Sequence, residues 1–196
     1  MGLAASEIQS PRSTASPFEG AHFSQWFRIA RPLAEGHPLF PGLFRCVRQA
    51  WNEVLGLQLF GKPLRSLGVS PQVLGVLFHE ALPIVVSEAY PEWRGPRQKS
   101  DKDLTCSDPQ FSVEVKVSSH PTTIFGNRSF VHSKGPKSRN KAGFYLAVNF
   151  DPDRQVLIRT RFGWLDPTDW VAQKAESGQQ AYLAPNSAFK LVDLDH

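Results

Sequence analysis

The chain has 196 residues, of which 41% are hydrophobic and 20% are charged. This is the length and composition of one globular domain, and it excludes a disordered or fibrous protein. No apolar run approaches the ~18 residues that span a bilayer, and we find no signal peptide, so we expect no membrane segment. The two cysteines, Cys46 and Cys106, have neither metal-site spacing nor a disulfide framework, which favours the reducing cytoplasm.

Basic charge is concentrated in one part of the chain. Between Arg94 and Lys141 there are ten Lys and Arg residues against four Asp and Glu, whereas the whole chain has a net charge of +4. Such an excess favours a polyanionic partner, and nucleic acid is the commonest one. A solvated basic face has the same composition, so the other residues of this window must decide between the two.

The first part of the chain predicts a tail followed by helices. Residues 1–17 are rich in Ser, Ala and Pro and predict a flexible tail. Residues 18–69 predict a helical N-terminal part, in which a first helix over Phe18 to Leu33 ends at Arg31-Pro32. A second helix with one apolar stripe begins near Pro41.

A third helix follows, over the segment PQVLGVLFHEALPIVVSEAY. Ser70 and Pro71 are a capping residue and a first-turn proline, which predict its start. Pro83 predicts a kink or a split. The helix carries Glu80, a residue type that faces solvent more often than a site.

The second half of the chain predicts a sheet. In FSVEVKVS, Phe111, Val113, Val115 and Val117 fall on one face of a strand, and Ser112, Glu114, Lys116 and Ser118 fall on the other. Further strands are predicted over Gly143–Phe150, which is apolar enough to be buried on both faces, over Val156–Phe162, and over Phe189–Leu194. Asp166-Pro167-Thr168-Asp169 predicts the start of a late helix through Trp170 and Val171. We expect one mixed α/β domain over residues 18–196, with residues 70–196 as its catalytic core.

A carboxylate and an amine lie two residues apart on the polar face of the first strand. Asp103 precedes the turn-like Cys-Ser-Asp-Pro, so a hairpin would return it beside Glu114 and Lys116. Two carboxylates, with the Val115 carbonyl, would hold Mg²⁺, and Lys116 would position or deprotonate a water for phosphodiester hydrolysis. A helix beside the sheet could direct Glu80 at the same place. The alternative is a strand whose polar face is simply solvated.

The arrangement resembles the PD-(D/E)xK nuclease superfamily, with a helix carrying Glu80, then Asp103, then Glu114-Val115-Lys116. The segments SDKDL, FSVEVKVSSHPTTIFGNRSF, KAGFYLAVNF and IRTRFGWLDPTDW resemble the ScaI family of type II restriction endonucleases. The resemblance runs from about Pro71 to the C-terminus, and IFGNRSF and GFYLAVNF are its most particular parts.

The resemblance implies a central mixed sheet flanked by helices, and a homodimer that cuts a palindromic DNA duplex with Mg²⁺. It also places Asp103, Glu114, Lys116 and Glu80 in the catalytic positions of the family. Lys102 stands where the superfamily name has proline, and Asp101 is a second candidate for the role of Asp103. We prefer Asp103 because Leu104 follows it, as expected at the edge of an apolar sheet.

Residues after the first strand are candidates for contacts with double-stranded DNA. Base edges are read by side chains in the grooves, whereas Lys and Arg mostly hold phosphates. The candidates beside the scissile position are His120, Thr122, Thr123, Asn127 and Arg128, and the candidates for phosphate contacts are Lys134, Lys137, Arg139 and Lys141.

Three functions remain open from the sequence. The first is a sequence-specific endonuclease. The second is a repair or junction-resolving nuclease with the same metal site, and the third is a non-catalytic DNA-binding module.

Overall fold

The computed structural model describes residues 15–98, 100–127, 141–173 and 180–194. The helices of the described residues are α1 (Trp26–Glu35), α2 (Phe40–Gly56) and α3 (Pro71–Ala89). The strands are β1 (Gln58–Leu59), β2 (Lys62–Pro63), β3 (Val113–Ser118), β4 (Phe125–Asn127), β5 (Gly143–Asp151), β6 (Val156–Leu165), β7 (Trp170–Ala172), β8 (Gln180–Leu183) and β9 (Leu191–Asp193). Short 3-10 helices include Pro109–Phe111, Pro167–Asp169 and Pro185–Lys190.

The central sheet has the strand order β3-β5-β6-β9. β3 is parallel to β5, while β5 with β6 and β6 with β9 are antiparallel, so the sheet is mixed. Among the described strands, β3 is therefore at the edge of the sheet and pairs only with β5. A smaller antiparallel sheet has the order β4-β8-β7, and β1 with β2 forms a hairpin. The predicted α/β class with a mixed central sheet is confirmed.

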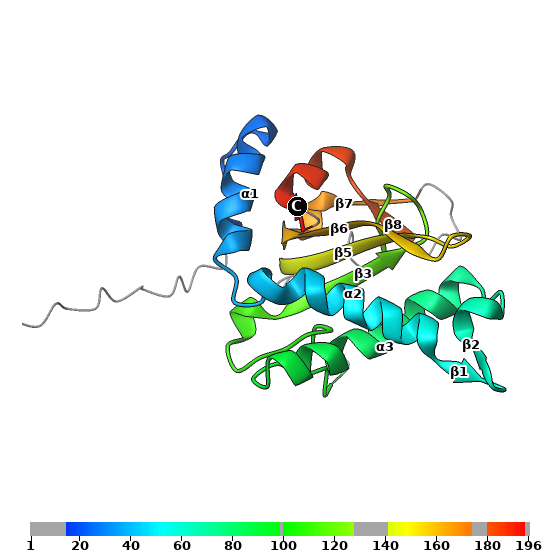
Figure 1. The fold of residues 1–196 in the computed structure, drawn as a ribbon. Coiled ribbons are helices and arrows are strands. Elements are labelled where there is room, and N and C mark those ends of the chain that lie inside the picture. The colour runs from blue at the N-terminus through cyan, green and yellow to red at the C-terminus, as the bar shows by residue number, and fades with distance from the viewer. Residues whose placement is uncertain (1–14, 99, 128–140, 174–179, 195–196) are drawn as a thin grey trace, which may run out of the picture.

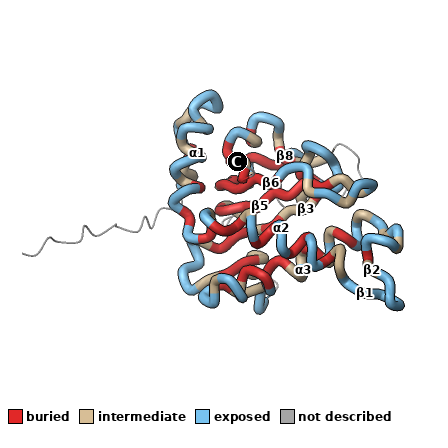
Figure 2. The backbone as a smooth tube through the Cα atoms, viewed as in Figure 1, coloured by how far each residue is buried: buried red, intermediate tan, exposed pale blue. Residues whose placement is uncertain are grey.

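Both faces of β5 are covered, which explains its continuous apolar sequence. Phe144, Leu146 and Val148 belong to the main core, together with the buried residues of α2 and α3. The alternate residues Tyr145 and Ala147 belong to a second cluster with residues of β7 and β8. In Figure 1, α2 and α3 run side by side along one face of the central sheet, and Figure 2 shows the burial concentrated between these layers.

One prediction about a proline inside a helix is wrong, and a second is excluded in part. The first helix does not end at Pro32, because α1 runs on to Glu35, and buried Ala30 and Ala34 hold it in place. α3 is not split at Pro83, since Leu82, Val85 and Val86 around this proline are buried and hold both halves. In each case the packing outweighs the single hydrogen bond that proline removes.

The predicted helix through Trp170 and Val171 is also wrong. Asp166 and Asp169 do form a capping box, but it closes only the 3-10 turn Pro167–Asp169. Trp170 then adopts an extended conformation and pairs with Leu183 as part of β7. Capping residues specify how a turn begins, whereas the pairing of the following residues decides where it ends.

Two predicted strands are shorter than expected at their starts. Phe111 and Ser112 precede β3, and Phe111 ends a 3-10 helix. Phe189 likewise lies in the helix Pro185–Lys190, so only Leu191–Asp193 is strand.

α3 also corrects the expectation about apolar runs. Within the described residues it is the helix long and apolar enough to cross a membrane by length and composition, with 33% of the window buried. This is weak evidence for a membrane, because core helices pass the same test. Leu74, Phe78 and Leu82 of α3 are indeed buried in the main core.

Candidate active site

Asp103 lies beside β3 because the chain makes the expected hairpin. Leu104 and Val113 form an antiparallel bridge, with backbone hydrogen bonds of 3.0 and 2.8 Å. This bridge places the Asp103 carboxylate at the outer edge of β3, where its Oδ2 accepts a hydrogen bond of 2.6 Å from the Val115 amide. In contrast, Asp101 Oδ2 accepts from the amides of Arg97 and Gln98 in its own exposed turn. The structure thus brings Asp103 to the strand and leaves Asp101 outside.

Glu114 and Lys116 share the polar face of β3, as the alternation predicted. Lys116 Nζ donates to Glu114 Oε1 at 2.5 Å, and the two side chains are 15% and 21% exposed. Partial burial strengthens the attraction between these charges compared with a pair in water. The pair is directed by the strand itself, because residues two apart point to the same side.

The two carboxylates repel each other. Burial raises the pKa of Asp103, and the nearby negative charge of Glu114 raises it further. Lys102, in the position before Asp103, is partly buried and donates to the Ala142 carbonyl at 3.0 Å. Burial lowers its pKa to about 8, although Glu114 opposes the shift. A partly buried pair of carboxylates of this kind gains free energy when a cation binds between them.

His79 of α3 is the residue at this site that the sequence analysis missed. Its Nε2 lies 3.0 Å from the Val115 carbonyl oxygen, and its Nδ1 lies 3.6 Å from Asp103 Oδ1. The sequence did contain a signal for His79. It lies four residues from Gly75 and from Pro83, on a line along the helix next to the buried stripe Leu74, Phe78 and Leu82. That spacing places His79 at the flank of the helix that borders the sheet.

The comparisons with known proteins decide the family. The model of the ScaI restriction endonuclease family matches residues 16–194. The chain is also 39% identical over 187 residues to the type II restriction enzyme ScaI of Streptomyces caespitosus, an alignment that covers 88% of this chain and 81% of that protein. This chain belongs to the ScaI restriction endonuclease family. It is a site-specific endonuclease of the type II class, as the resemblance implied.

The endonuclease has a groove between α3 and β3. One cavity of about 840 Å³ is lined by residues that include Gln72, His79, Lys116, His120 and Gln180. A second cavity of about 350 Å³ includes Asp103 and Arg94. His79 and Glu80 line both, so the two cavities adjoin at this point of α3.

Glu80 lies in the groove but apart from the other predicted catalytic residues. Glu80 is exposed, and its side chain makes no hydrogen bond or ion pair within the described part of the chain. The structure therefore brings Asp103, Glu114 and Lys116 together with His79, and leaves Glu80 facing the groove.

The predicted DNA-contacting loop follows β3 in the endonuclease. His120 lines the groove, and its Nδ1 accepts hydrogen bonds from the amides of Thr122 and Thr123. Buried Asn149 donates from Nδ2 to the carbonyls of His120 and Thr123, at 2.6 and 3.1 Å. Arg161 donates to Asn149 Oδ1 and to the Thr122 carbonyl. The central sheet thus holds this loop in place.

The other candidates for DNA contacts are only partly described. Asn127 is exposed at the end of β4. Lys141 precedes β5, and burial lowers its pKa while Glu114 raises it. Arg128, Lys134, Lys137 and Arg139 lie outside the described residues.

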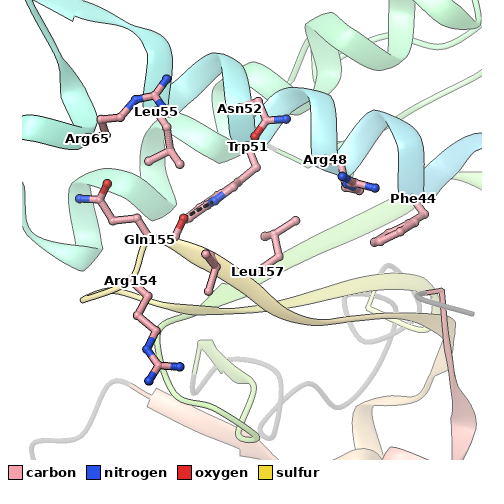
Figure 3. Close-up of a pocket in the computed structure, with 10 residues that line it drawn as sticks. Phe44, Arg48, Trp51, Asn52, Leu55, Arg65, Arg154, Gln155 and Leu157 are labelled. Atoms are coloured by element: carbon pink, nitrogen blue, oxygen red, sulfur yellow. Dashed lines mark hydrogen bonds between the residues drawn. The ribbon is translucent and has the colours of Figure 1, made fainter.

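A separate cavity of about 590 Å³ lies between α2 and the turn that joins β5 to β6. Trp51 Nε1 donates to the Gln155 carbonyl across it at 2.9 Å. Figure 3 shows Arg48, Arg65 and Arg154 at its rim pointing in different directions. These arginines do not converge on one anion, and no carboxylate is among the described residues that line the cavity, so the groove of α3 and β3 is the better candidate for the active site.

Proposed function

We propose that this endonuclease hydrolyses both strands of a DNA duplex at a specific palindromic sequence, with Mg²⁺ as its cofactor. The observation that carries the proposal is the convergence of Asp103, Glu114 and Lys116 on one edge strand that borders a groove. Membership of the ScaI family supports the substrate, and this geometry supports the site.

The residues present fit a hard divalent cation. Carboxylate oxygens are the ligands that Mg²⁺ prefers, and burial together with the negative charge of Glu114 raises the pKa of Asp103. No group of three or more His, Cys, Asp or Glu side chains that could hold a metal is found among the described residues. We assign the metal to two carboxylates, those of Asp103 and Glu114, and to the Val115 backbone carbonyl. When bound, Mg²⁺ would supply charge stabilisation at the scissile phosphate and lower the pKa of a water.

Lys116 then acts on the attacking water. Its ammonium group is held by Glu114 at 2.5 Å, which fixes the position of Nζ on the polar face of β3. From there it orients the water and stabilises the negative charge that develops on the phosphate. Glu80, which borders the groove, provides a further carboxylate toward the DNA side.

The PD-(D/E)xK architecture and the assembly are part of the same proposal. A mixed sheet whose edge strand carries Glu-Val-Lys beside a hairpin carboxylate supports this fold, as one domain over residues 18–196. A palindromic site has twofold symmetry, so a homodimer gives each DNA strand one active site. A DNA substrate and the free cysteines Cys46 and Cys106 agree with a cytoplasmic enzyme.

We assign DNA contacts to the loop after β3 and to the basic residues that follow it. His120 lines the groove, and Thr122 and Thr123 follow it in a loop that the sheet fixes, which favours base reading. Asn127 and Arg128 extend this set, and Lys134, Lys137, Arg139 and Lys141 contact phosphates.

Digestion of a sequenced plasmid tests the proposal. Discrete fragments with Mg²⁺ and none with excess EDTA are expected, and the fragment ends then give the recognition sequence. A smear or nicks would favour a repair nuclease. DNA retained in a gel shift but uncut with Mg²⁺ would favour a DNA-binding module.

A further inference from the structure

The turn of the β1–β2 hairpin holds a phenylalanine in an unfavourable backbone conformation. Leu59 pairs with Lys62, so Phe60 and Gly61 form a two-residue turn, and their φ angles are 53° and 72°. Positive φ at both central positions is characteristic of a type I′ turn, which prefers Asn, Asp or Gly at the first of them. A bulky residue with positive φ is an outlier, because its Cβ comes too close to the backbone. The geometry of the turn therefore does not account for phenylalanine at this position.

Phe60 is almost fully exposed. Its exposed fraction of 92% is the largest among the exposed large hydrophobic residues of the described chain, and Leu57 and Leu59 beside it are 48% and 46% exposed. An apolar patch of this kind gains free energy when another surface covers it. Strained residues cluster at sites that bind or react. A strained and exposed ring at the tip of a hairpin is therefore placed to contact a partner.

The base of the hairpin is anchored to the protein. The Leu64 amide donates to the Leu57 carbonyl at 2.7 Å, and the Leu64 side chain is buried in the main core. The chain then passes through the 3-10 turn Leu64–Ser66 to Pro71, which begins α3 and lines the groove. In Figure 1 the hairpin projects from the protein beside the N-terminal end of α3. The ring is thus held in place next to the helix that forms one wall of the groove.

Charge and substrate favour DNA as this partner. The chain contains no Asp or Glu from Val54 to His79, so the hairpin and its connection to the groove carry no carboxylate that would repel phosphates. The substrate of a site-specific endonuclease is DNA. Phe and Leu side chains insert between the base pairs of a duplex as apolar wedges, where they stack on bases and bend the duplex.

We propose that Phe60 contacts DNA, and that its ring stacks on bases near the groove as an apolar wedge. This inference rests on the proposed placement of DNA in the groove of α3 and β3. It goes beyond the proposed contacts, which all follow β3, because it adds one from the N-terminal part of the chain.

Phe60→Asn removes the ring and keeps the hairpin, because Asn-Gly is a preferred type I′ turn. The enzyme concentration that gives half-maximal single-turnover cleavage should rise about tenfold, as expected for the loss of one aromatic stack on a base. The melting temperature should stay the same or rise. Phe60→Trp should cut like the wild type, since it restores a ring. Phe27→Ala removes a phenylalanine of α1 that is 52% exposed, and it should leave cleavage unchanged.

2-Aminopurine fluorescence locates the contact without cleavage. The base analogue is placed at one position at a time along a duplex with the cognate site, and the protein is added with EDTA. Fluorescence should rise at one base step with the wild type and with Lys62→Ala, which keeps the ring in the same hairpin. It should not rise there with Phe60→Asn.

The outcomes separate this inference from the function on which it rests. Equal cleavage and equal fluorescence in Phe60→Asn and the wild type would overturn the role of Phe60, while discrete plasmid fragments would leave the proposed function intact. A signal that depends on Phe60, with a plasmid that remains uncut in Mg²⁺, would contradict the proposed function and support the contact. A change of oligomeric state in Phe60→Asn without DNA, measured by sedimentation, would assign the ring to a contact between two copies of the chain and overturn the inference.

Discussion

Asp103 and Val115 are joined by a hydrogen bond of 2.6 Å from the Val115 amide to Asp103 Oδ2, across 12 residues of sequence. The side chain thus takes the place of a missing neighbour strand at the edge of the sheet. It is held in place before any cation binds, which reduces the reorganisation needed for catalysis.

Asp103→Asn should abolish cleavage while DNA binding remains. The amide side chain keeps the size of Asp103 but removes one negative charge from the proposed metal site, at a cost of several kcal/mol in the transition state. We expect the single-turnover rate to fall about a thousandfold or more. Asp101→Asn is the matched control, because Asp101 caps its own turn, and it should cut at the normal rate. Equal losses in both variants would contradict the assignment.

Lys116→Ala should stop cleavage for a different reason. The variant retains both carboxylates, so it should still bind Mn²⁺ and cognate DNA, and only the rate of hydrolysis should fall. Lys116→Arg should restore little, because a planar guanidinium does not place a point charge at the Nζ position. Lys62→Ala removes an exposed lysine of β2 and should cut normally. Fragment yields over time measure all three.

The buried imidazole of His37 predicts a loss of stability in acid. Its Nε2 donates to the Phe111 carbonyl at 2.8 Å and its Nδ1 accepts from the Leu39 amide, so the neutral form is fully satisfied. Burial lowers its pKa from 6.5 to about 4. Since the unfolded chain binds this proton more readily, the free energy of unfolding should fall by about 3 kcal/mol as the pH drops from about 6.5 to about 4.

Urea denaturation at pH 7 and pH 4.5 measures this effect. His37→Gln is neutral at both values, so its stability should depend less on pH than that of the wild type. His22→Ala, at an exposed histidine, should keep the dependence of the free energy of unfolding on pH that the wild type has. If the stability of His37→Gln depends on pH as strongly as that of the wild type, other groups cause the acid sensitivity.

Asn149→Asp should loosen the proposed DNA-reading loop. The aspartate retains an acceptor for Arg161 but loses both donations to the loop carbonyls of His120 and Thr123. We expect a loss of about 1–3 kcal/mol in stability and a larger share of cleavage at sequences that differ by one base pair from the cognate site. Cleavage of matched oligonucleotide duplexes measures that share. Unaltered discrimination together with lower stability would confine Asn149 to a structural role.

Lys190→Ala should destabilise the contact between the N-terminal segment and the sheet, because Lys190 Nζ lies over the rings of Phe18 and Trp26. Lys190 is 3% exposed, and its Nζ lies 3.0 Å from Asp166 and 2.9 Å from Asp169. Removal of the lysine leaves two carboxylates without their cation, which costs about 3–5 kcal/mol. The melting temperature should fall on the order of 10 °C. Arg31→Ala breaks the exposed pair with Glu35 and should shift it little.

The sequence predicted which candidate side chains lie together better than it predicted the ends of elements. Alternation in β3 and the turn after Asp103 depend on local chemistry, so Asp103, Glu114 and Lys116 were found together. Whether a helix continues through Pro32 or Pro83 depends on packing against residues far away in the sequence, and a local pattern does not contain that information. His79 was missed for the same kind of reason. The rotation of α3 about its own axis, relative to the edge of β3, directs His79 and not Glu80 to Asp103.

The exposed edge of β3 gives this enzyme a built-in spectroscopic reporter. Backbone amides inside a sheet donate hydrogen bonds to carbonyls of a neighbouring strand. The Val115 amide instead donates to the Asp103 carboxylate, which can bind a proton or a cation. Any ion or proton that draws Asp103 away should shift the NMR resonance of this amide and speed its exchange with deuterium. One backbone signal then follows the loading of the active site in solution, without DNA.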